Sequence, residues 1–253
     1  MITRTNTRVI IERSAAQATE FAANLFRTIV CEAVEKEGSA NLALAGGTTP
    51  HALYRKLAST AATIDEVPWE STEVFFGDER DVPHDDVESN YYMAQQTLLD
   101  HIPVDPSRVH PMHADTEDIV AAAEEYEQTI RQTVPADDKG LPRFTLVLLG
   151  MGGDGHTASL FPGCDHVLDE PRKLVVGHFV PVLGRRRMTL TFPIINAAQN
   201  VMLLVTGDDK APAVQKLLSD EEKVRMGIPA SRVAPTDGML TIVLDESASM
   251  GVR

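Results

Sequence analysis

The sequence predicts an α/β fold, in which a doubly wound, mostly parallel sheet carries helices on both faces in a Rossmann-like arrangement. Short apolar runs recur along the chain, and most are apolar at every position, as in strands that are covered on both faces. Amphipathic segments with helix start signals separate these runs. Polar loops follow the runs, and in such folds ligands bind outside the carboxyl ends of the strands.

Five apolar runs are the expected strands. They cover residues 41–45, 72–77, 145–150, 201–207 and 239–245. The 253 residues suffice for one large α/β domain or two small ones, and no linker rich in Pro, Gly and Ser divides the chain. We therefore expect residues 1–253 to form a single domain.

Capping residues mark the expected helices between the strands. Ser14 and Gln17 form a capping-box pattern, and the apolar face that follows ends before Gly38, a residue type that terminates helices. The remaining capping signals predict helix starts at Thr49 (followed by Pro50), Ser89 and Asp115.

Composition and charge argue against two classes of partner. The formal net charge of −14 repels a nucleic-acid backbone, and an aromatic content of 5% is too low for a base-stacking platform. The sequence shows no run of transmembrane length and no signal-peptide pattern, and its two cysteines form no CxxC pair. We expect a reduced, cytoplasmic protein that binds neither nucleic acid nor membrane. Any anionic ligand must then be held by a local basic cluster.

The loop after the first expected strand, AGGTTP (45–50), has the outline of a phosphate cradle. Gly46 and Gly47 allow the backbone to approach a ligand closely, and Thr48 and Thr49 add hydroxyl groups at the start of a helix. The GK[ST] ending of a P-loop is absent. A plain capped turn explains the same residues, so the spacing alone leaves both interpretations open.

Basic residues follow other expected elements. Arg80 comes directly after a strand, where it could grip an anion or simply pair with a neighbouring acid, and Asp78 could orient a basic partner. In GRRRMTLTFP (184–193), three consecutive arginines precede a further expected strand with alternating polarity. Of the three, we select Arg187 as the ligand contact because it lies nearest that strand; a solvated basic edge would explain one or two of them. Lys210 stands at a helix start, which is unfavourable for a cation unless it faces an anion. Arg80, Arg187 and Lys210 could together form the basic pocket.

The segment GMGGDGHTASLFPG (150–163) leaves a strand through glycines and places Asp154 and His156 in the loop. A histidine in such a loop is suited to general base catalysis on water. The other interpretation is a sharp turn whose histidine caps a neighbouring carbonyl. No GxSxG elbow and no activated cysteine offers a covalent nucleophile.

Six segments resemble the 6-phosphogluconolactonases, which belong to a wider superfamily with the glucosamine-6-phosphate isomerase/deaminases. They are LALAGGTTPHALYRKLA, FFGDERDVPHDDVESNY, LVLLGMGGDGHTASLFPG, RRRMTLTFPIINAA, VTGDDKA and PASRV, in order from about residue 8 to 248. The resemblance implies hydrolysis of 6-phospho-D-glucono-1,5-lactone to 6-phosphogluconate in the oxidative pentose phosphate pathway, with no metal and no other cofactor.

The same resemblance implies roles for individual residues. His156 would be the general base that activates water against the lactone carbonyl, and Asp154 and Asp78 complete the expected catalytic set. The residues expected to hold the substrate and its phosphate are Gly46, Gly47, Thr48, Thr49, Arg80, Asn90, Gly152, Arg187 and Lys210. The family pattern often has proline where this chain has Gly153, so we expect a looser loop that keeps its role.

Two alternative functions remain. An amino-sugar phosphate isomerase/deaminase would need a catalytic glutamate after the histidine, but TASLFPG supplies no acid. A non-catalytic sugar-phosphate-binding domain would be expected to carry a DNA-binding segment, which the negative charge opposes. The sequence also leaves open whether Asp154 or Asp78 orients His156, and which of the three arginines contacts phosphate. We expect a monomer or a weak homodimer.

Overall fold

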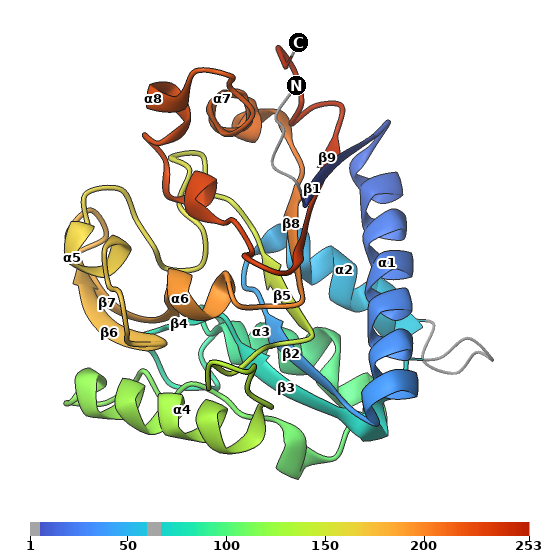
Figure 1. Ribbon diagram of the computed structural model, residues 1–253, viewed down its shortest axis with the longest axis vertical. Helices are drawn as coiled ribbons and strands as arrows, with labels where there is room; N and C mark the ends of the chain where they lie inside the picture. The colour runs from blue at the N-terminus through green and yellow to red at the C-terminus, as the bar shows by residue number, and fades with distance from the viewer. Residues whose placement is uncertain (1–5, 60–66, 253) are drawn as a thin grey trace.

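Two β-sheets organise the computed structural model, which describes residues 6–59 and 67–252 (Figure 1). The larger sheet is parallel, in the order β1 (Thr7–Glu12), β9 (Met239–Asp245), β8 (Asn200–Val205), β5 (Leu146–Leu149), β2 (Ala40–Leu44) and β3 (Thr72–Phe76). The smaller sheet is antiparallel, in the order β4 (Asp78–Arg80), β7 (Arg185–Leu190) and β6 (Val175–Val180).

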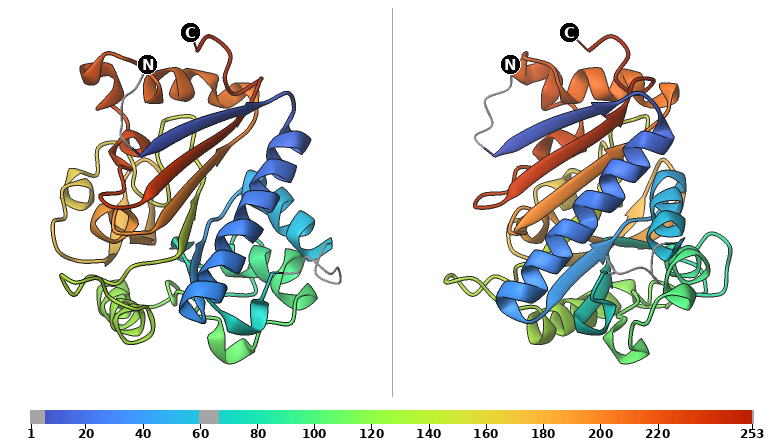
Figure 2. Two further views of the ribbon diagram at one scale, coloured as in Figure 1. Left: turned by 45° about the vertical axis from the view of Figure 1, so that its right-hand side comes forward. Right: turned by 90° about the vertical axis from the view of Figure 1, so that its right-hand side faces the viewer.

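The prediction of a mostly parallel sheet with helices is confirmed. The five expected strands are β2, β3, β5, β8 and β9. Every residue of β2 and β5 is buried, because other elements cover the large sheet on both sides. Figure 1 shows helix α1 (Ala15–Glu37) on one side of this sheet and the small sheet on the other, and Figure 2 shows α1 crossing the strands. Met188 and Leu190 of the small sheet join the same hydrophobic core as the large sheet.

Helices connect the strands. Besides α1 they are α2 (Thr48–Ser59), α3 (Asn90–Thr97), α4 (Ile119–Thr133), α5 (Asp165–Leu168), α6 (Phe192–Ile195), α7 (Ala211–Leu217) and α8 (Glu222–Arg225). Short 3₁₀ turns lie at Trp69–Ser71, Leu99–His101, Pro106–Arg108, Asp208–Lys210 and Pro229–Arg232.

Three predicted helix boundaries are confirmed. The Ser14 hydroxyl accepts a hydrogen bond from the Gln17 N–H at 3.3 Å, and Gly38 ends α1 with a φ of 81°, a left-handed conformation that glycine adopts readily. Ser89 caps α3 in the same way, by accepting a hydrogen bond from the Tyr92 N–H at 3.1 Å.

Two predicted helix starts are wrong. Helix α2 begins at Thr48 because the Gly47 carbonyl already accepts the first helical hydrogen bond, from the His51 N–H at 3.1 Å. The Thr49 hydroxyl therefore does not cap the helix and instead lies 3.1 Å from the Thr206 hydroxyl. Helix α4 begins after Asp118 rather than near Asp115, because the Asp118 carboxylate accepts hydrogen bonds from two N–H groups of the first turn.

The strand expected after the three arginines includes them. Arg185, Arg186 and Arg187 are the first residues of β7, and they pair with residues 178–180 of β6. Sequence pattern alone suggests a strand only from the apolar residues onward. Charged side chains are tolerated here because the first residues of β7 are exposed or half-buried, whereas the last three are buried.

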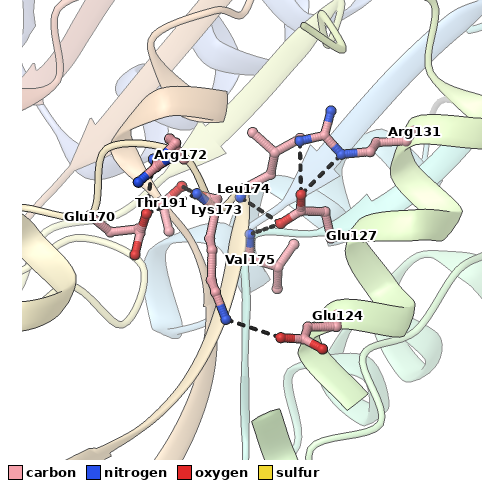
Figure 3. A network of polar contacts seen from close by, with 9 residues as sticks. All are labelled: Glu124, Glu127, Arg131, Glu170, Arg172, Lys173, Leu174, Val175 and Thr191. Atoms are coloured by element: carbon pink, nitrogen blue, oxygen red, sulfur yellow. Dashed lines mark hydrogen bonds and ion pairs between the residues drawn. The ribbon is translucent and has the colours of Figure 1, made fainter. Parts of the chain in front are cut away.

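Helix α4 is attached to the small sheet by a polar network (Figure 3). The Glu127 carboxylate accepts hydrogen bonds from the N–H groups of Leu174 at 2.7 Å and Val175 at 3.3 Å, where β6 begins, and it also pairs with Arg131 on its own helix. Lys173 pairs with Glu124, which lies on α4 about one turn before Glu127. This network fixes the entry of β6 and so helps to set the position of the small sheet.

The carboxyl ends of β2, β5 and β8 lie at one edge of the large sheet, where the predicted functional loops leave it. The described ranges contain no helix that is long and apolar enough to cross a membrane.

Candidate active site

A pocket of about 330 Å³ lies where the carboxyl ends of the parallel strands meet the small sheet. This volume suits a small sugar derivative. The sequence-predicted site residues that line it are Gly46, Gly47, Thr48, Thr49, Asp78, Arg80, Gly152, His156, Arg187 and Lys210. Asp154 and Asn90 are not among the lining residues, and both contact residues that are.

A tight turn after β5 presents His156 to the pocket. The Gly152 N–H donates to the His156 carbonyl and the Gly155 N–H donates to the Gly152 carbonyl, both at 2.9 Å. Gly155 has a φ of 84°, a left-handed conformation that favours glycine. The imidazole stacks on the ring of Phe161, with 4.1 Å between ring centroids and 25° between planes. The ring is therefore fixed on one face by an aromatic side chain.

Asp154 holds the imidazole from the other end of the turn. Its Oδ1 lies 2.6 Å from Nδ1 of His156 and accepts a hydrogen bond from the His156 N–H at 3.1 Å. Partial burial works to raise the pKa of Asp154, but the hydrogen bonds and the charge of His156 outweigh burial, so the pKa lies below its ordinary value. Asp154 is therefore a carboxylate at neutral pH. With Nδ1 engaged, Nε2 is the nitrogen left to accept a proton.

Asp78 is bonded elsewhere, which answers the question of which carboxylate orients His156. Its Oδ2 accepts a hydrogen bond from the Ser159 hydroxyl at 2.7 Å, and its Oδ1 accepts one from the Asn90 amide at 3.2 Å. The Asp78 side chain is 8% exposed and lines the pocket. Asp154 is thus the partner of the imidazole, and Asp78 is a second, separately fixed acceptor.

Glu79 and Asn90 form a scaffold behind the pocket wall. The buried Glu79 carboxylate accepts hydrogen bonds from the N–H groups of Arg80, Asn90 and Tyr91 and from the Ser89 hydroxyl. Burial raises the pKa of Glu79 in spite of these bonds. The interactions fix the start of α3 against β4, so that both neighbours of Glu79 in β4, Asp78 and Arg80, face the pocket.

Asn90 also explains why Gly46 carries no side chain. A Cβ atom at position 46 would lie 1.9 Å from Oδ1 of Asn90, closer than any contact allows. The buried Asn90 amide therefore packs directly against the glycine loop after β2. Asn90 was predicted to bind the substrate; the structure places its side chain between Asp78 and this loop, and its contact with a ligand stays a prediction.

Two of the three consecutive arginines are already paired. Arg185 forms an ion pair with Glu88, and Arg186 forms one with Asp81 at 2.8 Å. Arg187 lines the pocket and, among its contacts within the described chain, has a hydrogen bond to the Arg186 carbonyl but no ion pair. Burial, followed by the neighbouring charge of Arg80, lowers the pKa of Arg187. Both effects make an added anion favourable at this guanidinium.

The opposite wall supplies further anion-binding groups. The first N–H groups of α2, at Thr48 and Thr49, have no partner within the helix and lie beside Gly47, whose φ of 100° shapes the entry to the helix. Lys210 lines the same pocket while its Nζ lies 2.8 Å from the Asp209 carboxylate. Arg80 lines it too and donates a hydrogen bond to the Glu88 carbonyl. The three predicted cations therefore meet in one pocket, as expected.

Some pocket residues were not predicted. They are Ser159, Phe161, Met151 and Leu183. Ser159 and Phe161 lie in the segment 150–163, shortly after His156. A hydroxyl group and an aromatic ring so close to a candidate base could have indicated that both residues belong to the site. Leu183 comes from the turn between β6 and β7, which no sequence pattern connects to the site.

Comparison with known proteins shows the family to which the chain belongs. Residues 13–242 match the family model described as glucosamine-6-phosphate isomerases/6-phosphogluconolactonase. The chain belongs to this family. The 6-phosphogluconolactonase of Streptomyces coelicolor is 36% identical over 230 residues, which cover 89% of this chain and 88% of that protein. The 6-phosphogluconolactonase of Synechocystis is 35% identical over 248 residues, with coverage of 98% and 96%.

The fold agrees as well. The solved structure of 6-phosphogluconolactonase from Trypanosoma cruzi matches with a TM-score of 0.83 and 30% identity, and the match covers 97% of each chain. The resemblance expected from the sequence is confirmed. In the part of the chain that the structure describes, no three His, Cys, Asp or Glu side chains gather as metal ligands; the absence of a cofactor stays a prediction.

Proposed function

We propose that this protein hydrolyses 6-phospho-D-glucono-1,5-lactone to 6-phospho-D-gluconate, a step of the oxidative pentose phosphate pathway. One observation carries the proposal most directly: a histidine paired with a carboxylate and a cluster of three cations line the same small pocket. The chemistry of the substrate needs both, because a lactone carbonyl must be attacked by water while a distant phosphate is held. The relatives named above carry the same activity in their names.

His156 acts as the general base in this proposal. Its Nε2 takes a proton from water while the water oxygen attacks the lactone carbonyl carbon. The resulting tetrahedral intermediate breaks its bond between the carbonyl carbon and the ring oxygen, and His156 returns the proton to that departing oxygen. Asp154 keeps the imidazole in the tautomer with the proton on Nδ1 and stabilises the imidazolium formed between the two transfers.

The phosphate is bound by groups from both sheets. Arg187 has no carboxylate partner and donates from a half-buried position, while the start of α2 offers the N–H groups of Thr48 and Thr49. Lys210 adds a positive charge at the same pocket. Of the three arginines, Arg187 is our choice, since the ion pairs of Arg185 and Arg186 occupy the other two.

An amino-sugar phosphate deaminase activity is the nearest alternative within the family. It is not favoured by the residues that follow His156, because the turn continues through Thr157, Ala158 and Ser159 and offers no carboxylate for proton shuttling on an amino sugar. Release of ammonia from glucosamine 6-phosphate would contradict the proposal.

The decisive experiment measures loss of the lactone in the presence and absence of purified protein, since the substrate also hydrolyses spontaneously. We expect a clear acceleration by the wild type and none by His156→Ala, with 6-phosphogluconate binding kept in that variant. His101→Ala is the matched control: His101 is exposed, is not among the residues that line the pocket, and its Nε2 bonds to the nearby Gln96 carbonyl. Equal activity in wild type and His156→Ala would remove His156 from the mechanism.

The finer predictions of setting and assembly belong with the proposal. A cytoplasmic location, a single domain over residues 1–253, and a monomer or weak homodimer all stay predictions. Light scattering at several protein concentrations tests the last of these.

A further inference from the structure

Ser159 connects the loop that carries His156 to all three strands of the small sheet. Its hydroxyl donates to Asp78 of β4 at 2.7 Å, and its N–H donates to the Thr189 hydroxyl of β7 at 3.1 Å. Its carbonyl oxygen lies 2.9 Å from Nε2 of His178 in β6. Ser159 is only 1% exposed, and its hydroxyl, N–H and carbonyl groups are all hydrogen-bonded.

The preceding residue shows that this arrangement is enforced. Ala158 has a φ of 47°, in the left-handed region that residues other than glycine rarely adopt, and the turn is closed by a hydrogen bond from the Leu160 N–H to the Thr157 carbonyl at 2.9 Å. Such a conformation persists only where the surroundings hold it, and it concentrates at functional sites. Here the bonds of Ser159 hold it.

His178 is suited to be a fixed donor. It is 6% exposed, and burial lowers its pKa, so the ring is neutral at neutral pH and carries its proton on Nε2 toward the Ser159 carbonyl. The hydrogen bond therefore does not change as the pH varies around neutrality.

These hydrogen bonds of Ser159 determine how the Asp78 side chain is oriented. Each of its carboxylate oxygens accepts one protein hydrogen bond, from Asn90 and from Ser159. A carboxylate oxygen has two lone-pair sites, so each oxygen keeps acceptor capacity at a pocket-lining side chain. A sugar lactone presents hydroxyl groups as donors, and a carboxylate whose rotation is fixed on both oxygens can select their direction.

We propose that Ser159 is a positioning residue that orients the Asp78 carboxylate to accept a substrate hydroxyl group, and so sets the distance between the sugar ring and His156. Because Ser159 and His156 belong to the same loop after β5, the hydrogen bond from Ser159 fixes the substrate acceptor relative to the base. This inference rests on the proposed lactonase function for its substrate, while the geometry concerns Ser159 and Asp78 themselves.

The test compares Ser159→Ala with Thr189→Val. Both variants remove a hydrogen bond of Ser159, but only the first removes one of the two hydrogen bonds that hold the Asp78 carboxylate. We expect Ser159→Ala to raise KM for the lactone about 10-fold, the usual effect of losing one charge-assisted hydrogen bond, with a smaller change in kcat. Thr189→Val should keep KM within about 2-fold, and melting temperatures report any general loss of stability.

Two results separate this inference from a purely structural role. In an Asp78→Asn background, Ser159→Ala should raise KM no further, because its effect acts through the carboxylate. An unchanged KM in Ser159→Ala, an equal rise in Thr189→Val, or additive effects with Asp78→Asn would each overturn the inference. Calorimetric binding of 6-phosphogluconate by the same variants should weaken in the same order. If the wild type binds this compound without hydrolysing the lactone, the proposed function fails and the binding series still decides the role of Ser159.

Discussion

Gly152 and Gly153 are adjacent glycines in the turn that presents His156, and the structure predicts opposite outcomes for replacing them with alanine. Neither glycine has a positive φ, so backbone strain does not make the two replacements differ. Their surroundings do. A Cβ at Gly152 would lie 2.2 Å from two atoms of the His156 ring and 2.7 Å from Oδ1 of Asp154. A Cβ at Gly153 would meet nothing nearer than the Asp209 carbonyl oxygen at 3.5 Å.

The size of the effect follows from these distances. Ordinary contact needs about 3.5 Å or more between carbon atoms, so the imidazole must move by roughly 1 Å or more to admit a methyl group at position 152. A displacement of that size at a reacting group typically costs about 100-fold in rate. Phe161 stacks on one face of the ring and restricts where it can go. We therefore expect Gly152→Ala to lower kcat about 100-fold. We expect Gly153→Ala to keep kcat within about 2-fold and to stabilise the fold by about 0.4–1 kcal/mol through a less flexible unfolded chain.

The assay is lactone hydrolysis at saturating substrate, corrected for the spontaneous reaction, together with calorimetric binding of 6-phosphogluconate. Binding should survive in both variants, because the phosphate contacts that we propose come from α2, β7 and Lys210 rather than from this turn. A Gly152→Ala enzyme with nearly normal kcat would refute the assignment of the base. An equal loss in Gly153→Ala would refute the steric reasoning, since flexibility of the loop would then be the common cause.

Two more predictions test the anion site and the scaffold. Arg187→Ala should raise KM for the lactone about 10- to 100-fold, because Arg187 lines the pocket. Arg186→Ala loses an ion pair with Asp81 outside the pocket and should change KM less than about 3-fold. Steady-state kinetics measures both values, and equal effects would contradict the choice of Arg187. Glu79→Gln should lower the free energy of unfolding by about 2–3 kcal/mol at pH 7, because an amide cannot accept all four hydrogen bonds of the buried carboxylate. Since burial raises the pKa of Glu79, the part of its contribution to stability that depends on ionisation is fully present below the ordinary glutamate pKa and is lost as pH rises through the raised value; the loss expected at pH 7 comes from the hydrogen bonds. In urea denaturation from pH 4 upward, the free energy of unfolding should therefore change with pH more steeply in the wild type than in Glu79→Gln. Parallel curves of free energy against pH would contradict this role of Glu79.

The large sheet could be predicted from sequence because its strands are recognisable one at a time. Continuous apolar runs such as residues 41–45 and 145–150 need burial on both faces, and helix caps such as Ser14 and Ser89 act on the residue three positions later. Edge strand β1 has no such pattern: Val9 and Ile11 are 39% and 48% exposed, and its burial depends on β9 at the other end of the chain.

The small sheet could not be predicted in the same way. β4 consists of the three charged residues DER, and it becomes a strand because residues about 110 positions later pair with it. The roles within DER also differ for reasons invisible in sequence: Glu79 is buried behind the wall, while Asp78 and Arg80 face the pocket. Motif resemblance selected residues that the fold brings to one pocket, but only the fold shows that Asp154 rather than Asp78 contacts His156.

The division of the site between two sheets explains why an acidic protein can hold an anionic substrate. The loops after the parallel strands supply His156, the proposed base, and the start of α2, and the antiparallel sheet supplies Asp78 and Arg187. Asp81 and Glu88, in the loop after β4, are not among the pocket-lining residues, and they pair with Arg186 and Arg185. The protein as a whole is negatively charged. Within the described chain, however, Arg187 is the one of the three arginines that has no carboxylate partner. Consecutive arginines on one strand therefore have different surroundings: the first two pair with the acidic loop after β4, and the third lines the pocket, where we propose that it binds the substrate.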